Sequence, residues 1–477
     1  MSRIGTVVAR TWGKVDTRYL PFADVGTAEL PLRRLLRLSL FQVTVGMAVV
    51  LLIGTLNRVM IVELGVPAWL VALMVSLPLV FAPFRAIVGF RSDTHRSVLG
   101  WRRVPYIWMG TLLQFGGLAI MPFALIVLSG DANGPAWIGQ AGAALAFLML
   151  GAGLHTTQTV GLALATDLAP TEQQPKVVAL LCMMLLLGMI ASALIYGLLL
   201  HHFSEIRLIQ VIQGSALTTM VLNVIALWKQ EARDPSRTAF DRARPTFREA
   251  WAQFNAGLSA RRRLVALAIG TVGFSMQDII LEPFGGQILH LPVAATTALT
   301  ALLACGGLCG FGLAARVLGR GFDPYRLAAY GTLAGLVAFS SVIFSAPLDS
   351  VLLFAIGVAL IGFGAGLFAH CTLTAAMAMA PRGQVGLTLG IWSAVQASAA
   401  GLAIASGGLI RDGVTALIDA GWLGTALSDP STGYSVVYHL EIALLFATLI
   451  ALGPLVRSAR GAQSRQPTGF GLAGSPN

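Results

Sequence analysis

The feature that most constrains this chain is a series of long apolar segments, each close to the length that crosses a lipid bilayer. A helix needs about 20 consecutive apolar residues to span the hydrocarbon core. Twelve such segments lie near 38–62, 68–90, 104–128, 136–164, 175–200, 206–228, 264–289, 293–318, 326–345, 350–379, 383–410 and 435–456. Only 11% of the 477 residues are charged, against roughly 25% in soluble domains. The sequence therefore predicts an all-α polytopic membrane protein.

The distribution of basic residues predicts which side of the membrane each connection faces. Of the 32 Lys and Arg residues, all but Arg58, Arg85, Arg207 and Arg411 fall in the two tails and in alternate connections between the spans. By the positive-inside rule, these connections and both termini are cytoplasmic. The net charge of +11 is therefore a topology signal. It favours attraction to anionic lipid, and nucleic acid is not an expected partner.

A long basic segment divides the twelve spans into two sets of six. The expected parts are an N-terminal tail (1–37), a six-helix half (38–228), a central loop (229–263), a second six-helix half (264–456) and a C-terminal tail (457–477). Residues 247–258 of the central loop have apolar residues at helical spacing, which predicts an amphipathic helix on the cytoplasmic leaflet. A stretch in the fourth span (151–170) and one in the tenth (364–381) both begin with GAGL and end with Ala-Pro, which indicates two pseudo-symmetric halves.

The seventh span contains two acids in the stretch GFSMQDIILEPFGGQ. Asp278 and Glu282 are four residues apart, so they share one face of a helix. A charge within the hydrocarbon is costly and usually faces a polar cavity or a partner. Pro283 follows directly, and proline removes a backbone donor, so the helix is expected to kink or unwind here. A broken helix beside two acids is typical of a central transporter site; the alternative is that the acids only lock helices together.

The first span supplies the expected partners of these acids, Asn57 and Arg58. Counted back from the prolines that follow the two spans, Pro67 and Pro292, Asn57 and Glu282 are each ten residues away. Arg58 is then at a similar depth to Glu282. This match in depth predicts a buried ion pair between Arg58 and Glu282.

Other polar residues within the spans receive separate interpretations. Arg85, near the cytoplasmic end of the second span, is expected to extend to the interface. The same is expected of His439 and Glu441 at the outer start of the last span. His155 and His370 are candidate axial ligands for a metallated ring, because a neutral imidazole brings no charge to desolvate. The alternative for both histidines is an ordinary hydrogen-bonded role.

Catalytic and metal-ligating patterns are not found in the sequence. No nucleophile–base set, phosphate-binding loop or cluster of metal ligands is recognisable, so an enzyme is not expected. The four cysteines fall inside predicted spans and lack paired spacing. A disulfide framework and a zinc site are therefore not expected either.

The connection after the second span, GFRSDTHRSVLGWRR, resembles the corresponding loop of the major facilitator superfamily. The resemblance depends on the glycine at the helix end, on Asp93 and on the basic residues Arg102 and Arg103. In that superfamily the aspartate pairs with arginines and helix termini and latches the cytoplasmic side. The resemblance implies this latch role for Asp93, Arg102 and Arg103, and the major-facilitator fold for the chain.

Four longer stretches show a more specific resemblance. They are LNRVMIVELGVPAWLVALM, PFRAIVGFRSDTHRSVLGWRRVPYIWMG, HTTQTVGLALATDLAP and FSMQDIILEPFGGQIL. Together they resemble the PucC/LhaA family of purple phototrophic bacteria, the major-facilitator-like bacteriochlorophyll delivery proteins. The resemblance runs from about 32 to 457. It is nearest to the LhaA branch, tied to the LH1 antenna, while the PucC branch, tied to the LH2 antenna, stays open.

The resemblance implies a factor that helps antenna polypeptides acquire bacteriochlorophyll in the bacterial inner (intracytoplasmic) membrane. It implies proximity to bacteriochlorophyll synthase and the insertion machinery, no covalent cofactor, and bacteriochlorophyll bound only transiently. The residues themselves allow three interpretations. The first is an antenna-assembly factor. The second is a proton-coupled transporter of a tetrapyrrole or another small solute, in which Asp278 or Glu282 titrates. The third is a scaffold that holds antenna helices on its lipid-facing surface.

Overall fold

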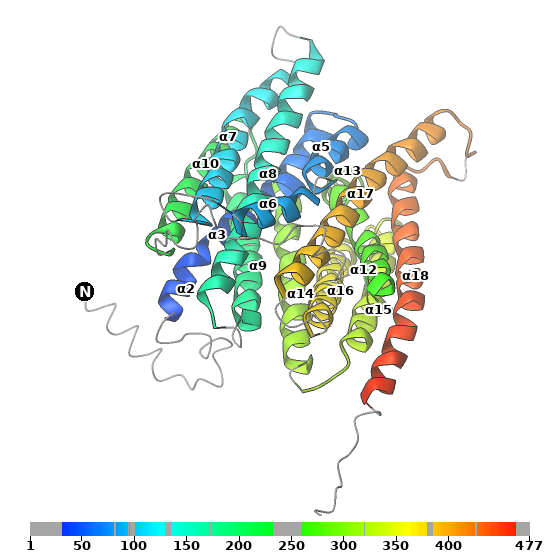
Figure 1. Cartoon of the computed structure of the whole chain (residues 1–477). Helices are drawn as coiled ribbons and strands as arrows, with labels where there is room; N and C mark the ends of the chain where they lie inside the picture. The colour runs from blue at the N-terminus through cyan, green and yellow to red at the C-terminus, as the bar shows by residue number, and fades with distance from the viewer. Residues whose placement is uncertain are drawn as a thin grey trace, which may run out of the picture.

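The computed structural model describes residues 31–80, 83–93, 95, 101–128, 135–170, 174–231, 260–318, 320–378, 385–424 and 427–463, and the regular structure in these residues is entirely helical. Figure 1 shows two helical bundles side by side. The predicted amphipathic helix of the central loop and most of both tails lie outside the described residues. The prediction of an all-α membrane protein is confirmed.

The N-terminal bundle contains six spans. The first is built from α2 (Leu32–Leu38), α3 (Leu40–Val49), the π-helical turns η2 (Val50–Thr55) and η3 (Val59–Glu63), and α4 (Leu56–Arg58) between them. The second is α5 (Ala68–Val80) and α6 (Pro83–Asp93). The others are α7 (Val104–Leu128), α8 (Ala136–Leu168), α9 (Gln174–Leu199) and α10 (Glu205–Leu227).

The C-terminal bundle repeats this order. Its first span consists of α12 (Ala260–Ser275), the 3-10 segment η4 (Met276–Ile279) and α13 (Leu281–Gln287). The others are α14 (Val293–Leu318), α15 (Pro324–Ser345), α16 (Val351–Ala378), α17 (Val385–Asp419) and α18 (Thr432–Gln463). Among the described residues, eleven helices are long and apolar enough to cross a membrane. The second predicted span is not among these eleven, and α5 and α6 occupy its residues.

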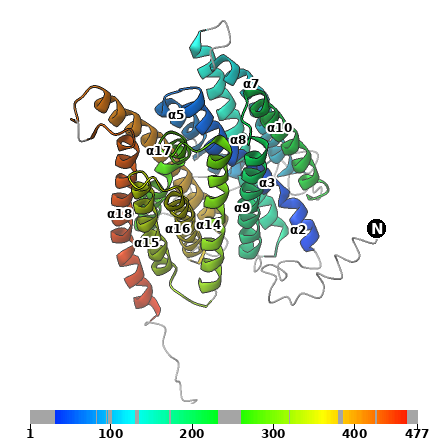
Figure 2. The same cartoon turned by 180° about the vertical axis from the view of Figure 1, so that it is seen from behind.

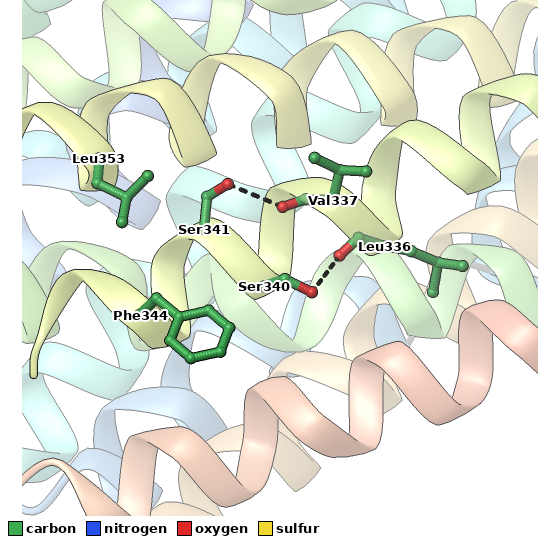
Figure 3. Close-up of a pocket in the computed structure, with 6 residues that line it drawn as sticks. All are labelled: Leu336, Val337, Ser340, Ser341, Phe344 and Leu353. Atoms are coloured by element: carbon green, nitrogen blue, oxygen red, sulfur yellow. Dashed lines mark hydrogen bonds between the residues drawn. The ribbon is translucent and has the colours of Figure 1, made fainter.

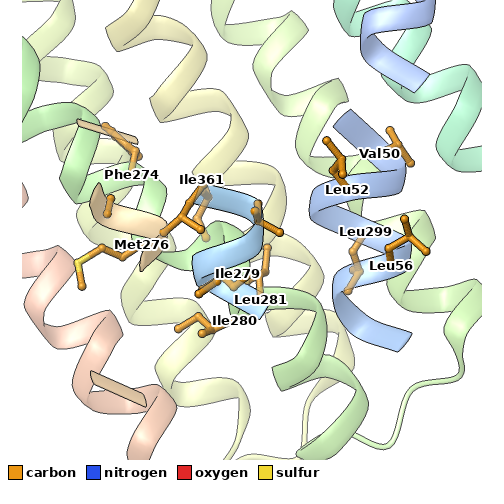
Figure 4. Packing of buried hydrophobic residues seen from close by; sticks show 14 of the residues in the cluster. Val50, Leu52, Leu56, Phe274, Met276, Ile279, Ile280, Leu281, Leu299 and Ile361 are labelled. Atoms are coloured by element: carbon orange, nitrogen blue, oxygen red, sulfur yellow. The ribbon is translucent and has the colours of Figure 1, made fainter. Parts of the chain in front are cut away.

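The two bundles meet along two pairs of helices, α5 with α17 and α9 with α14. Both views show α5 beside α17 (Figures 1 and 2). The first and seventh spans lie between these pairs. Their apolar side chains, among them Leu56 and Ile279, pack into one core that both bundles share (Figure 4). Since lipid is as apolar as leucine, such packing and the polar contacts within it, more than hydrophobic burial, hold the spans together.

Candidate functional site

The seventh span is broken where the sequence predicts a break. The helix α12 ends at Ser275, and α13 begins at Leu281 after one 3-10 turn. Pro283 has no N–H group, and its ring would clash with the carbonyl four residues earlier, which is that of Ile279. The Asn57 side chain donates to this carbonyl from Nδ2 at 2.9 Å. A side chain of the first span thus replaces the hydrogen bond that proline removes from the seventh.

The other end of the break is held by Glu441 of α18. Its Oε1 accepts a hydrogen bond from the backbone N–H of Gln277 at 2.7 Å. Glu441 is fully buried, so the expectation that it extends to the interface is wrong, whereas His439 is exposed. Residues 434, 438, 441, 445 and 448 follow helical spacing and are all buried. This stripe places Glu441 on the face of α18 that packs into the core. The helical spacing of these residues can be read from the sequence.

The two acids of the seventh span have different surroundings. Asp278 is half-buried and accepts a hydrogen bond from the side-chain amide of Gln277. Glu282 is 4% exposed, and its Oε1 accepts a hydrogen bond from the Thr300 hydroxyl on α14. Its Oε2 is buried without a hydrogen-bond partner. Because the acids lie on either side of Ile280, in separate helical segments, no continuous helix face joins them.

The predicted ion pair between Arg58 and Glu282 is wrong in its partner. Arg58 is 4% exposed and pairs with Glu63 of its own span. Its Nη2 also donates to the Leu291 carbonyl at 3.2 Å. A Cβ placed on Gly286 would lie 3.2 Å from Arg58 Nε, so Arg58 packs beside Gly286 of α13.

A shift of one helical turn explains the wrong partner. A Cβ placed on Gly54 would lie 2.7 Å from Oε1 of Glu282. Gly54 is thus level with Glu282, and Arg58, four residues further along, is level with Gly286. The prediction assumed the same rise per residue in both spans. The π-helical turns η2 and η3 pack more residues into each turn, so counting residues misjudges depth.

A second polar cluster joins the two bundles near the C-terminal end of the seventh span. Oε1 of Gln287 accepts hydrogen bonds from the Tyr434 hydroxyl at 2.5 Å and from Arg411 Nη2 at 2.7 Å. Arg411 forms an ion pair with Asp412 at 2.6 Å. Asp412 in turn accepts the backbone N–H of Trp69 at 2.7 Å, which connects α17 to α5.

The predicted latch residues Arg102 and Arg103 form a cluster within the N-terminal bundle. Both pair with Asp167 at the end of α8, and Arg103 also donates to Ser92 at 2.6 Å. The carboxylate of Glu231, after α10, accepts the backbone N–H groups of residues 102–104 at the start of α7. The side chain of Asp93 lies outside the described residues. Asp167 and Glu231 are acids of this cluster that the sequence analysis missed.

The two candidate histidines lie in separate bundles. His155 is on α8, and His370 is on α16, where its ring centroid is 4.0 Å from that of Phe311 on α14. In each histidine Nδ1 is buried without a hydrogen-bond partner. Ligation of a pigment by either histidine stays a prediction.

Arg85 does not extend to the interface as expected. Its Nε donates to the Thr159 hydroxyl at 3.1 Å and its Nη2 to Gln158 Oε1 at 2.9 Å. Both acceptors are side chains of α8. Arg85 therefore bonds across to the neighbouring helix, because polar acceptors lie within reach there.

The surface of the C-terminal bundle has a shallow groove on α15 and α16. Figure 3 shows its lining residues, Leu336, Val337, Ser340, Ser341, Phe344 and Leu353. The Ser340 and Ser341 hydroxyls donate to carbonyls one turn earlier, at 2.8 and 2.9 Å. Since these hydroxyls are already satisfied, the groove offers an apolar surface.

Comparison with known proteins gives one family over most of the chain. The family described as PUCC protein matches residues 55–460. A protein from Rhodovulum sulfidophilum named Protein PucC is 60% identical over 87% of this chain and 92% of its own. Protein PucC of Cereibacter sphaeroides is 54% identical over 97% of this chain and 100% of its own. The Bacteriochlorophyll synthase 44.5 kDa chain of Rhodobacter capsulatus is 29% identical over 91% of this chain and 97% of its own.

Solved structures share the fold at low sequence identity. A mutant of the nucleoside transporter NupG matches with a TM-score of 0.64 and 12% identity, over 88% of this chain and 99% of its own. A bacterial homologue of the iron transporter ferroportin matches with a TM-score of 0.59 and 16% identity, over 88% and 98%. These likenesses confirm the predicted major-facilitator fold.

Proposed function

Because this chain belongs to the PUCC protein family, we propose that it assists assembly of a light-harvesting antenna, of the LH1 type, in the bacterial inner membrane. In this proposal it helps antenna polypeptides acquire bacteriochlorophyll, which it binds transiently and without catalysing a reaction. Its termini are cytoplasmic, and its neighbours are the antenna polypeptides, bacteriochlorophyll synthase and the insertion machinery.

The observation that supports this proposal most strongly is the similarity to Protein PucC over nearly the whole of both chains. The region matched by the family, 55–460, includes the seventh span of this chain. The name of the 29% identical relative, Bacteriochlorophyll synthase 44.5 kDa chain, favours a role connected with pigment. The apolar groove on α15 and α16 has the chemistry to receive an antenna helix or a pigment tail.

The test is purification in mild detergent from a pigmented host, followed by an absorption spectrum and identification of the co-purified chains. We expect bacteriochlorophyll absorption together with LH1 polypeptides or the synthase. A colourless preparation without antenna subunits or synthase would refute the proposal. Deleting the gene and measuring LH1 and LH2 absorption separately identifies the antenna, because only the served complex should decrease.

A second candidate function is proton-coupled transport of a tetrapyrrole or another small solute. It is favoured by the carboxyl group of Glu282, which is buried in the membrane with Oε2 unpartnered, and by the transporter fold. The double variant Asp278→Asn with Glu282→Gln separates the candidates. Loss of proton-linked uptake in proteoliposomes would support transport. Normal antenna assembly in the same variant would show that these acids are not needed for assembly and would favour a scaffold.

A further inference from the structure

Arg85 carries a charge inside a membrane-spanning segment without an acidic partner. Its hydrogen bonds go to Gln158 and Thr159, and both acceptors are neutral. Among the described side chains, no carboxylate forms an ion pair with Arg85. A guanidinium stays protonated in proteins and has five N–H donors. Arg85 therefore keeps its positive charge and has donor capacity beyond the two bonds to α8.

His155 adds a second unsatisfied group at the same place. It precedes Gln158 and Thr159 by one helical turn, so the three side chains lie on one face of α8. Its Nδ1 is buried without a hydrogen-bond partner, and it lies one turn from the two side chains to which Arg85 donates. A permanent cation and an unpartnered ring nitrogen thus lie together between α6 and α8. In the part of the chain that the structure describes, no carboxylate forms an ion pair with either of them.

We propose that Arg85, His155, Gln158 and Thr159 bind the anionic head of an amphipathic ligand, a carboxylate or a phosphate. A guanidinium recognises two oxygens of such a group at once. The His155 ring and the amide of Gln158 supply further donors. The site lies within membrane-spanning helices, so the rest of the ligand is apolar. Two sources fit this chemistry, a tetrapyrrole with a free propionate and the phosphate of an anionic lipid.

The test measures binding of mesoporphyrin and of its dimethyl ester to the purified full chain in neutral detergent, by quenching of tryptophan fluorescence. The ester keeps the ring and removes the negative charges. We expect the acid to bind the parent at least about tenfold more tightly than the ester, as for a charge-assisted contact. Arg85→Gln should abolish this preference, and Arg85→Lys should keep part of it.

Arg91→Gln is the matched control, because Arg91 is an exposed arginine on the same helix. It removes the same charge and should leave the preference unchanged. Lysophosphatidylglycerol and lysophosphatidylcholine are then added as competitors. Displacement by the anionic lipid alone identifies a lipid phosphate as the ligand group, and no displacement identifies the tetrapyrrole carboxylate.

Three results would overturn the proposal. The first is equal binding of acid and ester to the unmodified chain, a comparison that requires no variant. The second is an intact preference in Arg85→Gln. The third is an equal loss of preference in Arg91→Gln, which would show that overall positive charge attracts the acid.

Discussion

The two bundles share one fold but, apart from the Arg411–Asp412 ion pair of α17, place charges of opposite sign within their spans. The N-terminal bundle buries Arg58 and half-buries Arg85, while the C-terminal bundle contains Asp278, Glu282 and Glu441 in its broken first span and in α18. An arginine cannot lose its proton in a protein, whereas a carboxyl group can take one up. The N-terminal bundle therefore needs an anion, either Glu63 or a ligand. The C-terminal bundle can become neutral by itself.

The bundles also differ in how closely the second span of each half packs against the fourth. In the C-terminal bundle, glycines of α14 and α16 bring the two backbones into direct contact, as Gly362 does against the Leu303 carbonyl. In the N-terminal bundle the equivalent span is divided into α5 and α6. A Cβ placed on Gly89 of α6 would meet only a methyl group of Thr159, at 3.7 Å. The wider spacing between α6 and α8 leaves space for the Arg85 side chain. The closer spacing between α14 and α16 leaves no space for such a side chain.

The largest effect is expected from adding one methyl group at each of these contacts. Gly362→Ala would place a Cβ against a backbone carbonyl that cannot move alone, and overpacking of this kind costs about 1–3 kcal/mol or more. Gly89→Ala should be nearly neutral. Thermal unfolding of both variants in detergent measures the difference. Equal stability of the two would show that the contact at Gly89 is packed as tightly as the contact at Gly362.

The acid that holds the broken span should come next in magnitude. Glu441→Leu leaves the buried N–H of Gln277 without an acceptor, and we expect a loss of about 1–3 kcal/mol of stability. Glu441→Gln keeps the acceptor oxygen and should lose much less. Thermal unfolding at constant pH compares the two. If the glutamine variant were as unstable as the leucine variant, the carboxyl charge and not its hydrogen bond would be the stabilising feature.

A double-mutant cycle tests whether Asn57 replaces the hydrogen bond that Pro283 removes. Asn57→Ala alone strips the Ile279 carbonyl of its donor. Pro283→Ala restores an N–H that can donate to that carbonyl. Asn57→Ala should therefore cost less in the Pro283→Ala background, by about 1 kcal/mol. Additive losses of stability in the cycle would mean that the two residues act separately.

The smallest effect is expected at the ion pair of the N-terminal bundle. Glu63→Ala leaves the buried Arg58 without its counterion, but the Glu63 side chain is 37% exposed and water can replace part of the interaction. We expect a loss below about 1 kcal/mol, recovered in part when Arg58→Ala is added. Arg58→Ala should not be rescued by Glu282→Gln, because the two side chains are not paired. A rescue of Arg58→Ala by Glu282→Gln in the same unfolding assay would support the Arg58–Glu282 pair that the sequence predicts.

These features differ in how far the sequence predicts them. The spans, the two halves and the break before Pro283 depend on composition and on local backbone chemistry, and all are found. The partner of Arg58 depends on how far each helix advances per residue, which the π-helical turns change. Glu441 was expected at the interface because it lies near the end of its span. Its helical spacing with the buried residues 434, 438, 445 and 448 indicates instead that it faces the core. Asp167 and Glu231 are acids far along the chain from Arg102 and Arg103, and only the packing of α7, α8 and α10 brings them together.

The bond from Asn57 to Ile279 also constrains how the molecule moves. A side chain of one bundle donates a hydrogen bond to a backbone carbonyl of the other. If the bundles separated at this level, the buried carbonyl would be left without a donor. Any opening has to bring water, a solute or another donor to that oxygen as the amide withdraws. Only a group with a hydrogen-bond donor, and not a hydrocarbon, can take the place of this amide.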